Sequence, residues 1–398
     1  MPAGLGAYRV VLADPAARAF SLAALVARLP ISMTGIGIVL LVSLESGSFG
    51  RAGLVTGAGT MTAAVSAPLW GRAVDRLGQA SVLVTASLVW TVAQGLLVTG
   101  VLLGWPFGAV VAAAVGVGLG FSSAGSAVRA RWNHRLQGSP LLDTAFAFEA
   151  VLDEVVFIVG PVLVTFLATR IHPAVALGVS AALGLVGALA LAAQRGTEPP
   201  RQPRRTADTV RARIDPGALA PVVVASVALG AIFGGMEVVI VAFATESGVL
   251  PWAGAILMAW AVGSLLAGVV AGTLTWRRSP AARFRIGAAC LALSLLPLPW
   301  LHAPLLLAAV LVVGGMAIAP TMIASVSVTQ AAVPHSRLTE ALAWSSTGLA
   351  GGLAVGAAAM GLLIDRGGSQ LGFAGVVGAG VLLTVAALGV RARPVAAP

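Results

Sequence analysis

The chain has 398 residues, of which 58% are hydrophobic and only 10% are charged, and its mean hydropathy is +0.98. A soluble protein of this size could not cover so much apolar surface, whereas a bilayer provides an apolar solvent for it. The formal net charge is +10, and all 24 basic residues are arginine. They are spread over many short segments and form no single patch, which argues against nucleic-acid binding.

Twelve apolar stretches, each about as long as a membrane crossing, follow one another along the chain. A spanning helix needs about 20 predominantly apolar residues, and runs without alternating polarity predict helices and not barrel strands. The first run is too long for the core of a signal peptide, so we expect it to be retained. We therefore expect an all-α membrane protein with twelve transmembrane helices, at residues 20–43, 53–71, 80–103, 106–128, 143–169, 174–194, 217–244, 250–275, 284–301, 303–332, 340–364 and 370–390.

The arginines predict the orientation of these helices. With the N-terminus in the cytoplasm, only Arg51, Arg170 and Arg366 fall in loops on the other side, and Arg28 lies inside the first span. Positive residues favour the cytoplasmic side. We therefore expect a multi-pass protein of the plasma membrane with both termini in the cytoplasm.

The two halves of the chain resemble each other. Residues 143–148 read D-T-A-F-A-F, and residues 339–344, an offset of 196, read T-E-A-L-A-W. The residues after the second and eighth spans match at a similar offset. We therefore expect two pseudo-symmetric six-helix bundles, residues 1–194 and 217–398, joined by a proline- and arginine-rich linker at 195–216.

The loop after the second span reads Gly71-Arg72-Ala73-Val74-Asp75-Arg76-Leu77-Gly78. It resembles the signature G-x-x-x-D-R-x-G of the major facilitator superfamily, although the basic residues that follow in that family are replaced here by Gln79 and Ala80. The resemblance implies the twelve-helix fold of that family and a gating role for Gly71, Asp75, Arg76 and Gly78. It also implies that Asp75 meets the start of helix eleven, where a carboxylate is favourable.

The fifth span contains the pair Gly160-Pro161, which is similar to the Gly-Pro motif of helix five in the drug:proton antiporters of the superfamily. The match is partial, because Val162 and Leu163 follow where small residues are expected. The alternative is an ordinary proline kink used for packing.

Three carboxylates lie in the fifth span, namely Glu149, Asp153 and Glu154. Ionisable groups at membrane depth cost about 2.5–3.5 kcal/mol each, so they usually have a function. The second half lacks these acids at the equivalent positions, which favours proton coupling over an architectural role. The alternative is that they pair with Arg28, Arg129 or Arg131 and hold helices together.

The candidate substrate site consists of large apolar residues and two isolated charges within the spans. Methionine and aromatic side chains adapt to varied ligands, and the scarcity of amides argues against a sugar. The same apolar residues could instead pack or face lipid. The candidates are Arg28, Met33, Phe121, Phe233, Met236, Glu237 and Met316, with Trp260, Met322 and Trp344 as further apolar positions.

No cofactor, metal or enzyme activity is expected. Cys290 is the only cysteine, the histidines are scattered, and neither a phosphate loop nor a nucleophile–base pair is visible. The sequence predicts a proton-coupled exporter of small hydrophobic or amphipathic compounds that acts as a monomer, with protons and lipids as its other partners. An importer or facilitator of a small metabolite and a non-transporting membrane sensor are the alternatives.

Overall fold

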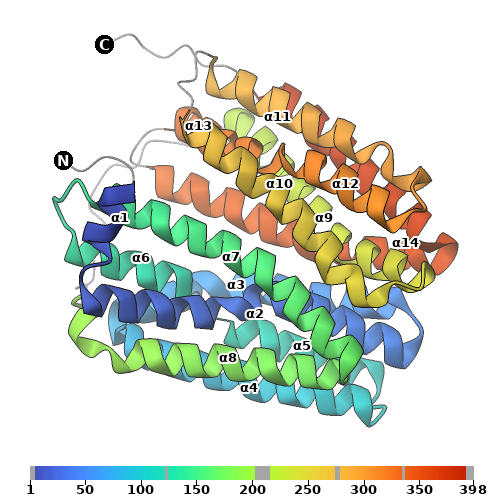
Figure 1. Ribbon diagram of the computed structural model, residues 1–398, viewed down its shortest axis with the longest axis horizontal. Coiled ribbons are helices and arrows are strands. Elements are labelled where there is room, and N and C mark those ends of the chain that lie inside the picture. Colours follow the sequence, from blue (N-terminus) through green and yellow to red (C-terminus); the bar gives the residue numbers. More distant parts are fainter. Residues whose placement is uncertain (1–4, 122–123, 202–215, 274–277, 334–336, 391–398) are drawn as a thin grey trace. The chain divides into compact units, whose positions relative to one another are not determined.

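The computed structural model describes residues 5–121, 124–201, 216–273, 278–333 and 337–390, and these residues form helices joined by short turns (Figure 1). The α-helices are α1 (Leu5–Val11), α2 (Pro15–Ser46), α3 (Phe49–Leu77), α4 (Gln79–Leu102), α5 (Phe107–Gly120), α6 (Ala124–Arg135), α7 (Leu142–Arg170), α8 (Pro173–Ala193), α9 (Pro216–Glu246), α10 (Ala253–Thr273), α11 (Pro280–Leu295), α12 (Pro304–Gly315), α13 (Ile318–Ala332) and α14 (Leu338–Gly389). Short 3₁₀ turns lie at Arg195–Thr197 (η1), Leu250–Trp252 (η2) and Leu298–Trp300 (η3).

Ten helical segments within the described residues are long and apolar enough to cross a membrane. They include α5 with α6, and α12 with α13, as single segments. The less apolar α3 is not among the ten, and α14 counts once although its backbone is non-helical at Gly367 and Gly368. The protein is therefore an all-helical, multi-pass membrane protein, while the predicted count of twelve crossings stays a prediction.

The chain divides into two compact units, one of Met1–Leu41 with Thr62–Thr206 and one of Val42–Met61 with Ala207–Pro398. The division differs from the predicted halves in residues 42–61, the end of α2 and the first part of α3. These residues cluster with the second unit because the backbone of α3 packs closely against α14. A Cβ atom at Gly53 would lie only 2.2 Å from the carbonyl oxygen of Ala357.

The first unit contains α1, α2 up to Leu41, the second part of α3, and α4 to α8. Buried aromatic and small apolar side chains pack one end of it, where Phe20 of α2 meets Trp132 of α6 edge-on, with ring centroids 4.8 Å apart. At the same end, Asp14 accepts a hydrogen bond from Arg135, and this contact lowers the pKa of the Asp14 carboxyl. The unit thus holds the N-terminal end of α2 firmly against α6.

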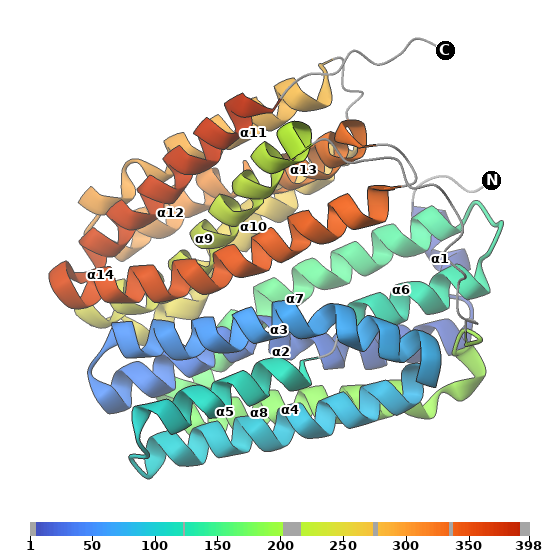
Figure 2. The ribbon, with the colours of Figure 1, turned by 180° about the vertical axis from the view of Figure 1, so that it is seen from behind.

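The second unit is organised around α9 and α14, which lie side by side (Figures 1 and 2). Glycines bring the two backbones into direct contact. A Cβ atom at Gly234 would lie 2.1 Å from the Leu353 carbonyl oxygen, and one at Gly356 would lie 2.3 Å from that of Ala231. Small residues let membrane helices approach in this way and gain van der Waals contact. We call this contact the glycine seam, made by Gly230, Gly234, Gly352 and Gly356.

Candidate functional site

The carboxylate of Glu149 on α7 is buried in the first unit and fully engaged. Its Oε2 lies 2.6 Å from Nη2 of Arg28 on α2. Its Oε1 accepts hydrogen bonds from the Ser21 hydroxyl at 2.7 Å and from the Trp132 indole at 2.8 Å. Burying a charge is tolerable when it is paired and hydrogen-bonded, and Glu149 meets both conditions.

Asp153, one turn further along α7, bridges two arginines. Its Oδ1 lies 2.7 Å from Nη1 of Arg28, and its Oδ2 lies 2.5 Å from Nη2 of Arg129 on α6. The side chain of Asp153 is 33% exposed, whereas those of Arg28 and Glu149 are almost completely buried. Asp153 therefore lies at the accessible edge of the network, and the four-residue spacing places it on the same helical face as Glu149.

Arg28 is the centre of this arrangement. It donates through Nη1 and Nη2 to two different carboxylates and through Nε to the carbonyl of Ala24 at 3.1 Å. The guanidinium fork suits such simultaneous contacts, since its donors point in fixed directions in one plane. With only 1% of its surface exposed, Arg28 pairs with the α7 acids here and does not face an open cavity.

Glu154 differs from its two neighbours. It is half-buried, and no hydrogen bond or ion pair to it is seen within the described residues. The network otherwise balances, because Arg28 and Arg129 carry two positive charges and Glu149 and Asp153 carry two negative ones. Of the three acids at positions 149, 153 and 154, Glu154 is thus the one without a counter-charge among the described residues.

Arg131, the third arginine considered as a partner for the acids, makes other contacts. It is fully buried and donates to Gln79 Oε1 at 2.9 Å, to Thr197 Oγ1 at 2.7 Å, and to the carbonyls of Leu191 and Gln194 at 3.0 Å each. These contacts cap the end of α8 and tie η1 to the start of α4. Gln79 follows the Gly71–Gly78 motif where the family has a basic residue. Its Oε1 accepts a hydrogen bond from the guanidinium group of Arg131 on α6.

The residues of the Gly71–Gly78 motif lie at the end of α3. Asp75 and Arg76 are exposed, and no hydrogen bond or ion pair to Asp75 is seen in the part of the chain that the structure describes. Gly78 has a φ of +87°, a left-handed conformation that favours glycine at the turn into α4. The predicted contact of Asp75 with the start of helix eleven stays a prediction. Ser336 and the side chain of Thr339, which lie near the start of that helix in the sequence, fall outside the described part.

The Gly160-Pro161 pair lies within α7, which continues through it as a helix. A Cβ atom at Gly160 would lie 1.9 Å from the hydroxyl oxygen of Ser32 on α2, and that hydroxyl donates to the Val156 carbonyl at 2.7 Å. Gly160 therefore allows α2 and α7 to pack closely beside the charged network. The role that the resemblance to the antiporters implies for the pair stays a prediction.

The candidate substrate residues do not gather in one pocket of either unit. Met33 and Met236 are fully buried among other core side chains. Phe121 is half-buried at the end of α5, and Phe233 packs edge-on against Trp260, with ring centroids 5.4 Å apart. A ligand could reach the two methionines only after the helices move.

Two further candidates differ in surroundings. Met316 is 47% exposed and lines a largely apolar groove of about 570 Å³ formed by α11, α12 and α13. Glu237 on α9 is half-buried, and no hydrogen bond or ion pair to it is seen among the described residues. Glu237 is thus an intramembrane carboxyl without a visible counter-charge in the second unit, as Glu154 is in the first.

Sequence reasoning missed two groups that contact the network, namely Ser21 and Trp132. Serine and tryptophan carry no charge, so nothing in their local sequence distinguishes them from ordinary interfacial residues. The signal that could have found Trp132 is its position three residues after Arg129, on one face of α6. No group of three or more His, Cys, Asp or Glu side chains that could hold a metal ion occurs among the described residues.

The fold is that of a membrane transporter. The nucleoside transporter NupG superposes with a TM-score of 0.72 at 14% sequence identity, covering 95% of this chain and 99% of that one. A bacterial homologue of the human lysosomal transporter Spinster, in an inward-facing and unoccupied conformation, gives 0.66 at 16% identity, with 98% and 97% covered. A POT family transporter in complex with a thioalcohol-conjugated peptide gives 0.66 at 14% identity, with 94% of each chain covered.

The family model of the Major Facilitator Superfamily matches residues 20–314. The chain therefore belongs to the Major Facilitator Superfamily. A sequence comparison with curated proteins found no match. The structural neighbours named here are below 25% identity, so they establish the fold and leave the substrate to be inferred from the site.

Proposed function

We propose that this protein is a proton-coupled exporter of small hydrophobic or amphipathic compounds that works by alternating access. In this proposal it has twelve transmembrane helices in two bundles, with both termini in the cytoplasm. Membership of the Major Facilitator Superfamily supports transport of a small molecule. The proposed direction, coupling and substrate class rest on the carboxyl groups and on the apolar character of the spans.

The observation that carries the proposal is the surplus carboxyl group on α7. Two arginines neutralise Glu149 and Asp153, and Glu154 remains beside them without a partner among the described residues. A carboxylate without a counter-charge is expensive at membrane depth, and binding a proton removes that cost. We therefore assign Glu154 as the proton carrier, Asp153 as its neighbour at the accessible edge of the network, and Glu149 as the group that positions Arg28.

Coupling follows if a proton and a substrate favour opposite conformations. A ligand shifts an equilibrium only through its different affinities for the two states. Protonation of Glu154 would neutralise its negative charge, which lies beside Asp153. The electrostatic interaction of Asp153 with Arg129 would then change. A negative cell interior would drive protons inward by about 2.3 kcal/mol per charge per 100 mV, and each inward proton would return the transporter for another export step.

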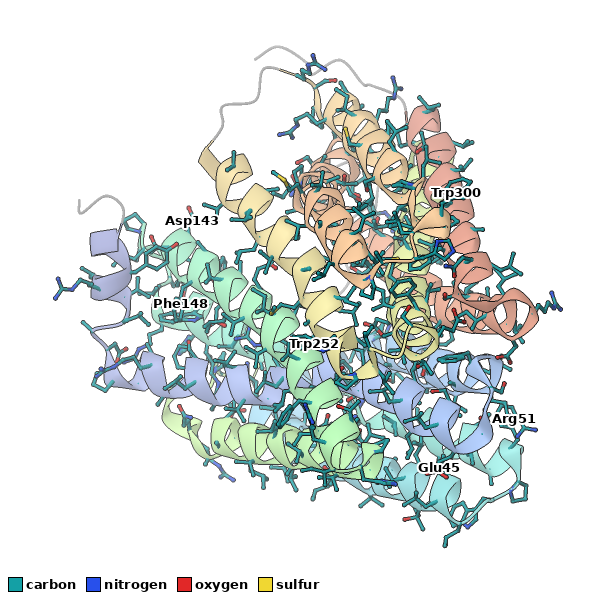
Figure 3. All side chains as sticks on the ribbon, turned by 45° about the vertical axis from the view of Figure 1, so that its right-hand side comes forward. Glu45, Arg51, Asp143, Phe148, Trp252 and Trp300 are labelled. Atoms are coloured by element: carbon teal, nitrogen blue, oxygen red, sulfur yellow. The ribbon has the colours of Figure 1, made fainter. Side chains whose placement is uncertain are left out.

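The test uses inside-out membrane vesicles with an acidified interior, containing the full chain, and ethidium as a fluorescent amphipathic probe. The parent protein should accumulate ethidium in exchange for protons, and a protonophore should abolish the accumulation. Glu154→Gln should lose this uphill accumulation and keep downhill ethidium exchange. Asp143→Asn is the matched control, because Asp143 lies exposed at the start of the same helix (Figure 3) and should behave like the parent.

Two results would overturn parts of the proposal. If Glu154→Gln and Asp153→Asn both keep uphill accumulation with normal pH dependence, the coupling site lies elsewhere, and Glu237 becomes the next group to test. If the parent protein accumulates no dye but admits uridine down its gradient, facilitated entry of a metabolite replaces export. Absence of any flux would favour a sensor.

A further inference from the structure

The gating motif of the sequence occurs a second time. Residues 361–368 read Gly-Leu-Leu-Ile-Asp-Arg-Gly-Gly, which matches G-x-x-x-D-R-x-G at every fixed position, as residues 71–78 do. These are the only two Asp-Arg pairs in the chain, and each has glycine four residues before the Asp and three residues after it. The first copy ends α3, and the second ends the first part of α14, where Gly368 has a φ of +72°.

In the second copy, the carboxylate of Asp365 binds the start of another helix. Its Oδ1 accepts from the Phe49 amide at 2.8 Å, and its Oδ2 accepts from the Gly50 amide at 3.0 Å and from the Ser48 hydroxyl at 2.6 Å. Phe49 and Gly50 are the first residues of α3. Their amides have no partners within the helix, and the helix dipole favours a negative charge there.

Glycines hold α3 and α14 together next to this contact. A Cβ atom at Gly361 would lie 2.3 Å from the Phe49 carbonyl oxygen, and one at Gly53 would lie 2.2 Å from that of Ala357. A Cβ atom at Gly57 would lie 2.7 Å from the carbonyl oxygen of Ala354. As the residue number increases along α3, the number of the contacting residue on α14 decreases, so the two helices run antiparallel here. Any side chain at Gly53 or Gly361 would force their backbones apart.

The two motif copies lie at the ends of two helical segments. α3 ends at Leu77, within the first copy, and the first part of α14 ends at Gly367 and Gly368, within the second. The family resemblance implies that Asp75 meets the start of helix eleven. In this structure Asp365 is engaged, whereas Asp75 is exposed and a Cβ atom at Gly71 would meet nothing within 4 Å.

We propose that Gly361–Gly368 is a second gating motif, in which Asp365 latches the first residues of α3 and closes the side of the transporter opposite Asp75. This inference rests on the proposed alternating access and on the proposed topology. That topology places the turn between α2 and α3 outside the cell; Glu45 and Arg51, on either side of this turn, are labelled in Figure 3. Opening the outer side breaks the Asp365 latch, and closing the inner side forms the Asp75 contact. One pair of helices thus carries a matching carboxylate latch at each end.

The test measures how open the outer side is, without any transported substrate. In the full chain with Cys290→Ser, a cysteine is placed at Ala358, whose Cα would lie 3.2 Å from a Cβ atom at Gly53. Labelling of intact cells by a membrane-impermeant maleimide should be slow in this parent. Asp365→Asn keeps the shape but removes the charge that the helix terminus favours, and should speed labelling by about three- to tenfold.

Three variants sharpen the result. Gly53→Val should speed labelling too, and combining it with Asp365→Asn should add little, because both break one contact. Asp75→Asn weakens the opposite latch and should not speed labelling. Asp143→Asn is the matched control, since Asp143 is an exposed carboxylate at the start of α7; the substitution removes the same charge outside the motif and should leave the rate unchanged. Thermal unfolding of each purified variant shows whether the fold is intact.

The latch is overturned if Asp365→Asn labels at the parent rate, or if Asp143→Asn speeds labelling as much as Asp365→Asn does. These outcomes are separable from the fate of the proposed function. Labelling that responds to Asp365→Asn in a protein that drives no ethidium export would keep the latch and remove the export assignment. Export that proceeds normally, with labelling unchanged by Asp365→Asn, would keep the export assignment and remove the latch.

Discussion

Glu149 and Arg28 are 121 residues apart in the chain, yet Oε2 of Glu149 lies 2.6 Å from Nη2 of Arg28 in a pair that is almost completely buried. This pair joins α7 to α2 inside the first unit. It also fixes the guanidinium group that reaches Asp153, one turn away. The stability of the unit and the position of Asp153, the neighbour of the proposed proton carrier Glu154, therefore depend on the same arginine.

Removing the charge of Glu149 should destabilise the protein strongly. Glu149→Gln leaves Arg28 with one carboxylate partner. The glutamine amide also has only one acceptor oxygen for the three donors Arg28, Ser21 and Trp132. Breaking a buried ion pair from one side costs about 3–5 kcal/mol. Thermal unfolding in detergent should show a large loss, and Glu340→Gln, which breaks the exposed pair with Arg337, should change stability by less than about 1 kcal/mol. Equal effects of the two substitutions would contradict the assignment.

Lysine should not replace Arg28. Lys keeps the positive charge but presents a single ammonium group, which cannot reach Glu149, Asp153 and the Ala24 carbonyl in the same geometry. Arg28→Lys should lower the free energy of unfolding by about 1–3 kcal/mol and impair proton-driven ethidium accumulation. If the lysine variant matches the parent in both measurements, the fork geometry is unimportant.

Arg131→Ala should loosen the attachment of the linker. The substitution leaves Gln79, Thr197 and the carbonyl groups at the end of α8 without their donor, at a cost of about 2–4 kcal/mol. Trypsin should then cleave faster after Arg195 and Arg201, as followed by gel electrophoresis of purified protein. Arg135→Ala, which loses only the partly exposed contact with Asp14, is the control and should leave the rate of cleavage nearly unchanged.

A side chain at Gly352 should disrupt the second unit. A Cβ atom there would lie 2.0 Å from the Val227 carbonyl oxygen, whereas one at Gly95 in α4 would meet nothing within 4 Å. Gly352→Val should therefore reduce the yield of folded protein or its thermal stability severely, because two backbones must separate. Gly95→Val places the same residue in an open position and should be far milder.

The topology can be tested with one cysteine. In a Cys290→Ser background, a cysteine at Pro203, which lies outside the described residues, should resist an impermeant maleimide added to intact cells and react after the membrane is opened. The expectation follows from the arginine bias of this linker. Labelling from outside would reverse the orientation and would place Asp75, not Asp365, on the outer side.

The helical membrane fold and the family could be predicted from the sequence, because hydropathy reports directly on the solvent of the chain and the Gly71–Gly78 motif is local. The four-residue spacing of Glu149 and Asp153 likewise predicted one shared face, and both acids contact Arg28. The choice of Arg28 and Arg129 over Arg131 was not predictable. All three arginines lie near the acids by span depth, and only the packing of α6 decides which way each one points.

The second copy of the motif is visible in the sequence, but the sequence alone does not indicate its role. The family pattern places the motif in the loop between the second and third spans. Nothing local marks Asp365 as the partner of a helix 315 residues away. The division of the chain within α2 and α3 depends on backbone contact through glycines. Such contacts involve two distant segments at once, so no single segment encodes them.

The glycine seam has a mechanical consequence. Side-chain layers can slide or change rotamer, but α9 and α14 touch backbone to backbone, so a displacement of one is imposed on the other with little slack. Glu237 lies one turn beyond Gly234 on α9, and Asp365 lies on α14. We therefore expect a displacement of α9 at Glu237, which has no hydrogen-bond or ion-pair partner among the described residues, to be felt at Asp365 through contact between the two backbones.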